Sequence, residues 1–272
     1  MNTVIESPTI NLVVIGDSAG YGVGDQHGDE VRGWAWYLSR VFYDSCNYQN
    51  FSRPGAQSTE VLQVQLPLAL ASAPDICAVI VGGNDLLRNG FSPAKLYQNL
   101  MDTCTQLMHM GSEVVLIELH DPNKLLKLPK LLKRVLHRRV ESVNQTYYRV
   151  ADELGALLVR TREIPNVHDL QNWHVDRMHP GTQGHQLLAR EIATVLRKRG
   201  WSLQLPQLEK KVARAKSQDI KWLLRNGLPW FLKRSVDLLP AALILMGIES
   251  IRVIIEATFQ RGENRNISLP TL

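Results

Sequence analysis

Residues 10–24 read INLVVIGDSAGYGVG, and the architecture predicted for the chain follows from this stretch. From Ile10 to Ile15 it is a short, nearly continuous apolar run, which is typical of a strand buried on both faces of a parallel sheet. Glycine ends the run and recurs after Ser18, so the backbone can turn sharply there and a ligand can come close to it. Ligands of open α/β sheets bind beyond the carboxyl ends of the strands. Ser18 therefore has the position of a nucleophile.

The rest of the chain alternates strand and helix patterns up to about residue 200. Apolar runs of strand length predict four more strands, over 48–51, 76–81, 113–119 and 156–160. Spacing and boundary residues predict helices over 31–44, 59–72 and 93–110, from Pro129 to about 154, and over 183–199. Strands that alternate with helices imply a doubly wound parallel sheet.

Length and composition favour one large domain with an extension. The chain has 272 residues, 44% apolar and 21% charged, which is ordinary for a soluble globular protein. Its three cysteines, Cys46, Cys77 and Cys104, lack metal-ligand spacing, so we predict neither a disulfide framework nor a metal site. The N-terminus has no basic region followed by an apolar one, which predicts a cytoplasmic protein.

The basic character of the chain belongs to its C-terminal region. Residues 201–272 hold 11 Lys and Arg against 6 Asp and Glu, whereas residues 1–200 hold 20 of each. After about residue 205 the pattern is helical, and its longest uncharged run, 238–248, is well short of the ~20 residues that span a bilayer. Aromatic and basic residues around Trp222 and Trp230 suit a helix that lies on an anionic membrane. Packing on the first domain or on a second subunit is the alternative.

A second basic stretch, residues 124–139, reads KLLKLPKLLKRVLHRR. Three interpretations stay open for it: a lid over a substrate cleft, a membrane-facing patch, or an amphipathic helix whose lysines are simply solvated.

The loop over residues 172–181 supplies what a serine nucleophile needs. A serine hydroxyl is activated by an imidazole that a carboxylate orients, and His179 follows Asp176 by three residues. His174 competes for the role of base but has no carboxylate three residues before it. A tetrahedral oxyanion also needs donors, which the N–H groups of Ser18 and Gly55 and the Asn84 amide are placed to provide. We expect Asp85 to support its loop and His185 to be structural.

Four sequence blocks occur in order, each at a predicted strand end or loop: Gly16-Asp17-Ser18, Gly55, Gly82-Gly83-Asn84-Asp85 and Asp176-Arg177-Met178-His179-Pro180. With these blocks the chain resembles the SGNH hydrolases of the GDSL esterase/lipase family over about residues 8–200. The resemblance implies Ser18 as nucleophile, His179 as general base and then acid, and Asp176 as its orienter. It also implies an oxyanion hole of Ser18, Gly55 and Asn84. Arg53-Pro54 before Gly55 departs from the family pattern.

The fold that this resemblance implies is a three-layer α/β/α, flavodoxin-like domain with a five-stranded parallel sheet. We assign residues 1–203 to this domain and residues 204–272 to the helical, basic extension. The expected activity is hydrolysis of acyl or lipid carboxylic esters through an acyl-enzyme, without metal or cofactor. Thioester hydrolysis or acyl transfer would use the same machinery.

A catalytically silent α/β domain with a membrane- or protein-binding tail is the alternative from another class. The expected partner is a small-molecule or lipid ester and not a nucleic acid. The expected location is the cytoplasm, with peripheral contact to the inner face of the membrane if the C-terminal helices bind it. The oligomeric state is not predicted.

Overall fold

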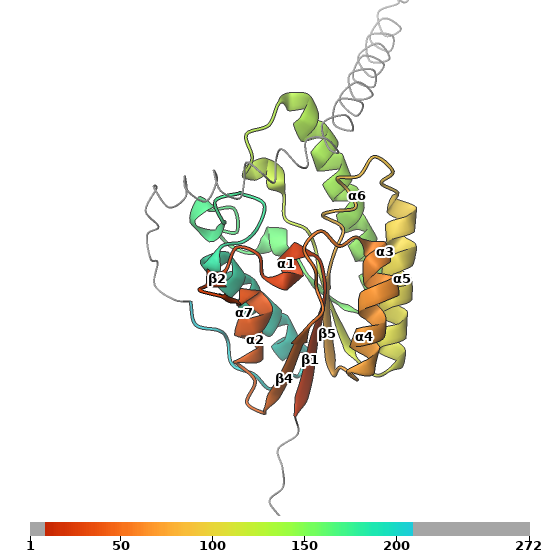
Figure 1. Cartoon of the computed structure of the whole chain (residues 1–272), viewed down its shortest axis with the longest axis vertical. Coiled ribbons are helices and arrows are strands. Elements are labelled where there is room, and N and C mark those ends of the chain that lie inside the picture. The colour runs from red at the N-terminus through yellow and green to blue at the C-terminus, as the bar shows by residue number, and fades with distance from the viewer. Residues whose placement is uncertain (1–8, 209–272) are drawn as a thin grey trace, which may run out of the picture.

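The computed structural model describes residues 9–208 and contains a five-stranded parallel sheet (Figure 1). The strands lie in the order β4-β1-β5-β6-β7, so β1 is flanked on both sides. Their bounds are β1 Ile10–Gly16, β4 Cys46–Asn50, β5 Ile76–Ile80, β6 Glu113–Ile117 and β7 Leu157–Val159. The predicted five-stranded, doubly wound sheet is confirmed, and its strand order is the flavodoxin-like one.

Helices cover both faces of the sheet and complete three layers. One face carries α2 (Gly33–Ser39) and α7 (Thr182–Arg199). The other carries α3 (Ser58–Glu60), α4 (Leu66–Ala71), α5 (Pro93–His109) and α6 (Lys130–Leu154). Figure 1 shows the two groups on opposite sides of the strands, with the short helix α1 (Ser18–Tyr21) at the end of β1.

The continuous apolar run of β1 is explained by these two layers. Successive side chains of a strand point to opposite faces. Leu12 and Val14 pack into the core beneath α2 and α7, whereas Val13 and Ile15 pack into the core beneath α5 and α6. All four are buried. Because neither face meets water, no polar residue alternates with them.

The helix predicted over 31–44 is shorter than expected. Residues Glu30–Val31 form β3, which pairs antiparallel with β2, Gln26–His27. The helix begins only at Gly33, whose φ of +69° and close approach to Gly22 require a glycine. It ends at Ser39 because the next residues turn to a distant segment: the Val41 carbonyl accepts from Gln204 N–H at 2.7 Å.

Three side chains bind the backbone where strands end. The Gln65 amide, on the π-helical turn Val61–Gln65, accepts from the N–H of Gly16 at 2.7 Å and donates to its carbonyl at 2.9 Å. The Tyr147 hydroxyl accepts from and donates to the backbone of Val81, both at 2.8 Å. The Asn144 amide pairs in the same way with Leu119, at 2.9 and 2.8 Å. The ends of β1, β5 and β6 are thus held by one layer of helices.

After α7 the chain still packs on the domain. The Arg190 guanidinium donates to the carbonyl of Pro206 at 3.2 Å, and Leu203 is buried. Apart from residues 204–208, the extension predicted for 204–272 lies outside the described residues, so the domain division stays a prediction. None of the helices within residues 9–208 combines the length and apolar character that crossing a membrane requires.

Candidate active site

Ser18 lies directly beyond the carboxyl end of β1. Asp17 caps α1, since its carboxylate accepts from the N–H of Ala19 at 3.0 Å. The turn needs glycine at position 16, because a Cβ there would lie 2.0 Å from the Ile80 carbonyl oxygen. Asp17 itself is 4% exposed, and this burial raises its pKa to about 6. The serine is therefore fixed at the sheet edge by a tight turn against β5.

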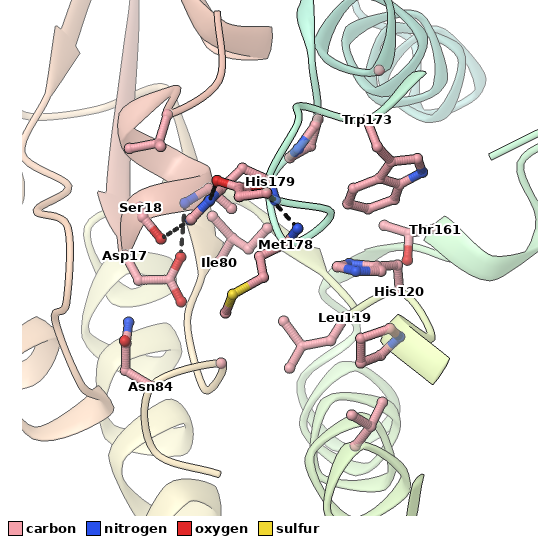
Figure 2. A pocket seen from close by; sticks show the side chains of 18 of the residues that line it. Asp17, Ser18, Ile80, Asn84, Leu119, His120, Thr161, Trp173, Met178 and His179 are labelled. Carbon is pink, nitrogen blue, oxygen red and sulfur yellow. Dashed lines mark hydrogen bonds and ion pairs between the residues drawn. The ribbon is translucent and has the colours of Figure 1, made fainter. Parts of the chain in front are cut away.

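Ser18, His179 and Asp176 form one hydrogen-bonded chain (Figure 2). His179 Nε2 lies 2.8 Å from Ser18 Oγ, and His179 Nδ1 lies 2.9 Å from Asp176 Oδ2. Asp176 Oδ1 accepts the N–H groups of Met178 and His179, at 2.9 and 3.0 Å. These two backbone bonds fix the Asp176 carboxylate within its own loop. The position of the carboxylate relative to the His179 imidazole is therefore fixed as well. The structure brings the three predicted residues together.

His174 contacts Asp176 from a second direction. Its Nδ1 lies 3.0 Å from Asp176 Oδ2, the same oxygen that faces His179. Its backbone N–H donates to the carbonyl of His179 at 2.9 Å, which ties the two ends of the loop. Burial alone would raise the pKa of Asp176, but hydrogen bonds from His174 and His179 hold it below its ordinary value. The sequence left His174 open as an alternative base. In the structure His179 contacts Ser18, whereas His174 contacts the carboxylate of Asp176.

The predicted oxyanion donors line one cavity with Ser18. Gly55 and Asn84 belong to its wall, and Figure 2 shows Asn84 on the same side as Ser18 and Asp17. Within residues 9–208 the backbone N–H groups of Ser18 and Gly55 have no acceptor. The Asn84 amide donates to the Ala56 carbonyl at 3.1 Å and carries a second N–H.

Asp85 holds the loop that carries Gly55. Its carboxylate accepts the Ser58 hydroxyl at 2.6 Å and the Ser58 N–H at 3.1 Å. The Asn99 amide donates to the same hydroxyl at 2.9 Å. Asp85 therefore takes part in supporting its surroundings, as the sequence indicated.

The cavity beside Ser18 has a volume of about 730 Å³ and a mostly apolar wall. Ten of its apolar side chains come from loops and helices far apart in the chain: Leu86, Leu87, Leu119, Leu126, Leu136, Val140, Ile164, Val167, Leu187 and Leu188. Two of them, Leu126 and Leu136, belong to the basic stretch 124–139. One side of that stretch therefore faces the cavity and forms part of its wall.

His120 is a cavity residue that the sequence did not single out. It lies across the cavity from Ser18, with Thr161 and Trp173 (Figure 2), and its ring centroid is 4.0 Å from that of Trp173. Desolvation lowers the pKa of His120 to about 3, so the ring is neutral at physiological pH. Only its position directly after an apolar strand hinted that it would reach the sheet edge.

Both ring nitrogens of His185 form hydrogen bonds with backbone groups, so this histidine has a structural role. The N–H of Trp34 donates to its Nδ1 at 3.2 Å, and its Nε2 lies 3.1 Å from the Val23 carbonyl. The side chain is fully buried, and burial lowers its pKa to about 4. His185 thus joins α7 to α2 and to the turn after α1.

The pH dependence of the free energy of unfolding is expected to reflect this lowered pKa of His185. The unfolded chain binds a proton at His185 near its ordinary pKa of about 6.5, but the folded protein binds it only near pH 4, so stability falls as pH drops through this window. His185→Gln lacks this dependence. The stability advantage of the wild type over the variant should shrink by about 2.5 kcal/mol between pH 7.5 and 4.5. Urea unfolding at both pH values measures it, and a constant difference would contradict the assignment.

A serine, a histidine and an aspartate hydrogen-bonded in series at the carboxyl edge of a doubly wound sheet is the arrangement of a serine hydrolase. A family model, GDSL-like Lipase/Acylhydrolase family, matches residues 14–187, more than half of the chain. The chain belongs to this family, and the protein is a carboxylic ester hydrolase of the SGNH superfamily.

Solved structures share the fold. TesA is 26% identical, with a TM-score of 0.55, over 69% of this chain and 98% of its own. The esterase EstA from Pseudoalteromonas sp. is 19% identical, with a TM-score of 0.54, over 70% of this chain and 97% of its own. A catalytic mutant of the acetylxylan esterase Axe2 from Geobacillus stearothermophilus is 18% identical, with a TM-score of 0.56, over 71% of this chain and 95% of its own. Comparison with curated protein sequences gives no match.

Proposed function

We propose that the protein hydrolyses carboxylic esters with an apolar acyl chain, with Ser18 as nucleophile, His179 as base and Asp176 as its orienter. The observation that carries this proposal is the hydrogen-bonded chain from Asp176 through His179 to Ser18, at the wall of an apolar cavity. His179 Nε2 faces the serine hydroxyl while Nδ1 faces the carboxylate, which is the order that general-base catalysis needs.

In the proposed reaction, Ser18 Oγ attacks the ester carbonyl carbon while its proton passes to His179 Nε2. The carbonyl oxygen becomes an oxyanion, which the N–H groups of Ser18 and Gly55 and the Asn84 amide would bind. The C–O bond to the alcohol then breaks, and the proton on His179 goes to the leaving oxygen. A water molecule, deprotonated by His179, then attacks the acyl carbon. The ester bond to Ser18 Oγ breaks, and the proton on His179 returns to Oγ.

The cavity wall favours an acyl chain over a carbohydrate. Sugars are bound through hydrogen bonds to their hydroxyl groups, whereas the surface of this wall is mostly apolar and leucine is its commonest residue. An acetylxylan substrate, which the Axe2 structure names for that enzyme, therefore fits this chain less well than a lipid-like ester. A thioester, or an alcohol in place of water, would use the same groups.

A series of p-nitrophenyl esters from acetate to palmitate tests the proposal. Each buried methylene contributes about 0.8 kcal/mol of binding, so kcat/KM is expected to rise at least tenfold from acetate to octanoate. Leu126→Asn should remove most of this rise while hydrolysis of acetate changes little, so acetate serves as the internal control.

A maximum at acetate, with no gain from longer chains, would contradict the acyl-cavity part of the proposal. If no ester is hydrolysed, labelling by a fluorophosphonate separates two explanations. Labelled Ser18 would indicate an active serine with narrow specificity, and an unlabelled one would favour the catalytically silent domain. The cytoplasmic location and membrane contact through the C-terminal helices stay predictions.

A further inference from the structure

Positive charge is concentrated in the stretch 124–139, here called the basic segment. Between Asp121 and Glu141 the chain holds seven Lys and Arg and no carboxylate. The remainder of residues 1–200 holds 13 Lys and Arg against 20 Asp and Glu. Outside the basic segment, the hydrolase domain therefore has a net negative charge. Within the domain, the excess of positive charge is confined to the basic segment.

Four cations of the basic segment are available to an external anion. Lys124, Lys127, Lys130 and Arg134 are exposed, and none of them takes part in an ion pair with another residue of the described range 9–208. Because their charges are uncompensated nearby, their fields add.

Arg139 differs from these four residues. Its guanidinium donates to the carbonyls of Leu86 and Arg88, at 2.5 and 2.8 Å, and so fixes α6 against the loop after β5. The exposed Lys130 and Arg134 therefore lie on a helix that Arg139 fixes to the rest of the domain.

The opposite side of the basic segment faces the cavity beside Ser18. Leu126, Leu136 and Val140 line that cavity, and Leu136 and Val140 are one helical turn apart. Lys130 and Arg134, also one turn apart, are exposed instead. One short stretch therefore presents cations outward and lines the apolar cavity inward.

We propose that the basic segment is the surface with which the protein docks on an anionic lipid membrane. Leu128, Leu131 and Leu132 lie half-buried between the cations, and such interleaving of leucine with lysine suits the boundary between headgroups and acyl chains. Lysine and arginine keep their charge at the headgroups while their methylene stems cover apolar surface. A nucleic acid would need the cations but not the leucines. Docking is independent of turnover and does not rest on the proposed esterase activity.

The test is co-sedimentation of the full chain with vesicles, with two charge-matched variants. Lys127→Gln/Lys130→Gln/Arg134→Gln removes three cations from the basic segment. Lys95→Gln/Lys198→Gln/Arg197→Gln removes two lysines and one arginine that are also exposed but lie elsewhere. The vesicles contain either phosphatidylcholine alone or phosphatidylcholine with about 30% phosphatidylglycerol, which supplies the anionic surface.

The wild type is expected to bind the anionic vesicles and not the neutral ones, more weakly at high salt. Each cation near an anionic surface contributes about fivefold to partitioning, so the basic-segment variant should bind about 100-fold more weakly. The variant with changes elsewhere should bind almost as well as the wild type. Unchanged thermal unfolding midpoints would show that both variants are folded.

Three results would overturn the proposal: absence of wild-type binding to anionic vesicles, equal loss in the two variants, or equal retention in both. Equal loss would indicate a general effect of net charge. Equal retention would place the membrane contact in another part of the chain. Binding of a DNA duplex without vesicle binding would assign the segment to a nucleic acid instead.

Discussion

Ser18→Ala is expected to lower kcat for ester hydrolysis by about 10⁵-fold or more, because removal of the nucleophile of a hydrogen-bonded triad removes the covalent route altogether. The residual rate would come from the oxyanion donors and from binding in the cavity. KM should change little, since Oγ is a small part of the contact with the acyl chain. Steady-state kinetics on p-nitrophenyl octanoate measures both constants.

Two further variants show whether the loss belongs to the chain of three residues. Asp176→Asn should lower kcat by about 10⁴-fold. The amide oxygen would stay at the Oδ1 position, which accepts two backbone N–H groups, so the amide NH2 would face His179 Nδ1. Because this NH2 group donates, Nδ1 would have to accept, and the proton would sit on Nε2, the wrong tautomer for a base. Ser39→Ala removes a serine hydroxyl that donates to the Trp36 carbonyl, and it should keep the wild-type rate. If Ser18→Ala kept more than a hundredth of the activity, Ser18 would not be the nucleophile.

Gly24→Ala is expected to lower kcat by about 10²-fold or more without touching a reacting group. A Cβ at this position would lie 2.1 Å from the Pro180 carbonyl oxygen and 3.1 Å from His174 Cβ. Both contacts are on the loop that carries Asp176 and His179, so the loop must move away from Ser18. A displacement of about 1 Å is enough for such a loss.

Gly28→Ala is the matched control for this effect. Gly24 and Gly28 both have a positive φ, +103° and +63°, so alanine is strained at either position. A Cβ at Gly28 would have no atom within 4 Å. This control should lose stability but keep the wild-type kcat. Equal kcat in the two variants, with both folded by circular dichroism, would show that the Gly24 contact does not position the loop.

The parts of this fold that are local in sequence are the parts that the sequence predicted. The apolar run of β1 and the polar residues after it specify a strand buried on both faces and a site at its end. The spacing of Asp176 and His179 places carboxylate and imidazole on one short loop, where the Asp176 carboxylate also binds two backbone N–H groups. These features depend on a few residues that are close together in the chain. Such local patterns can be recognised in a single sequence.

Features that depend on contacts between distant segments were missed. The length of α2 follows from the pairing of Val41 with Gln204, which no local pattern displays. The role of His174 was missed for another reason: Asp176 is only two residues away, but their contact depends on how the loop closes. Gln65 lies in a π-helical turn and binds Gly16, 49 residues away in the sequence, and an amide in a helix gives no sign of such a partner.

The bonds that Gln65, Tyr147 and Asn144 make to strand ends have a consequence for how this domain can be altered. Each of the three fixes a strand end, or the first residues after it, from the helix layer. The positions of these strand ends are therefore set independently of the length and sequence of residues 122–129, which form one part of the cavity wall. Engineers can exchange residues 122–129, between Leu119 and α6, to change the size of molecule accepted, while the relative positions of the strand ends are inherited unchanged.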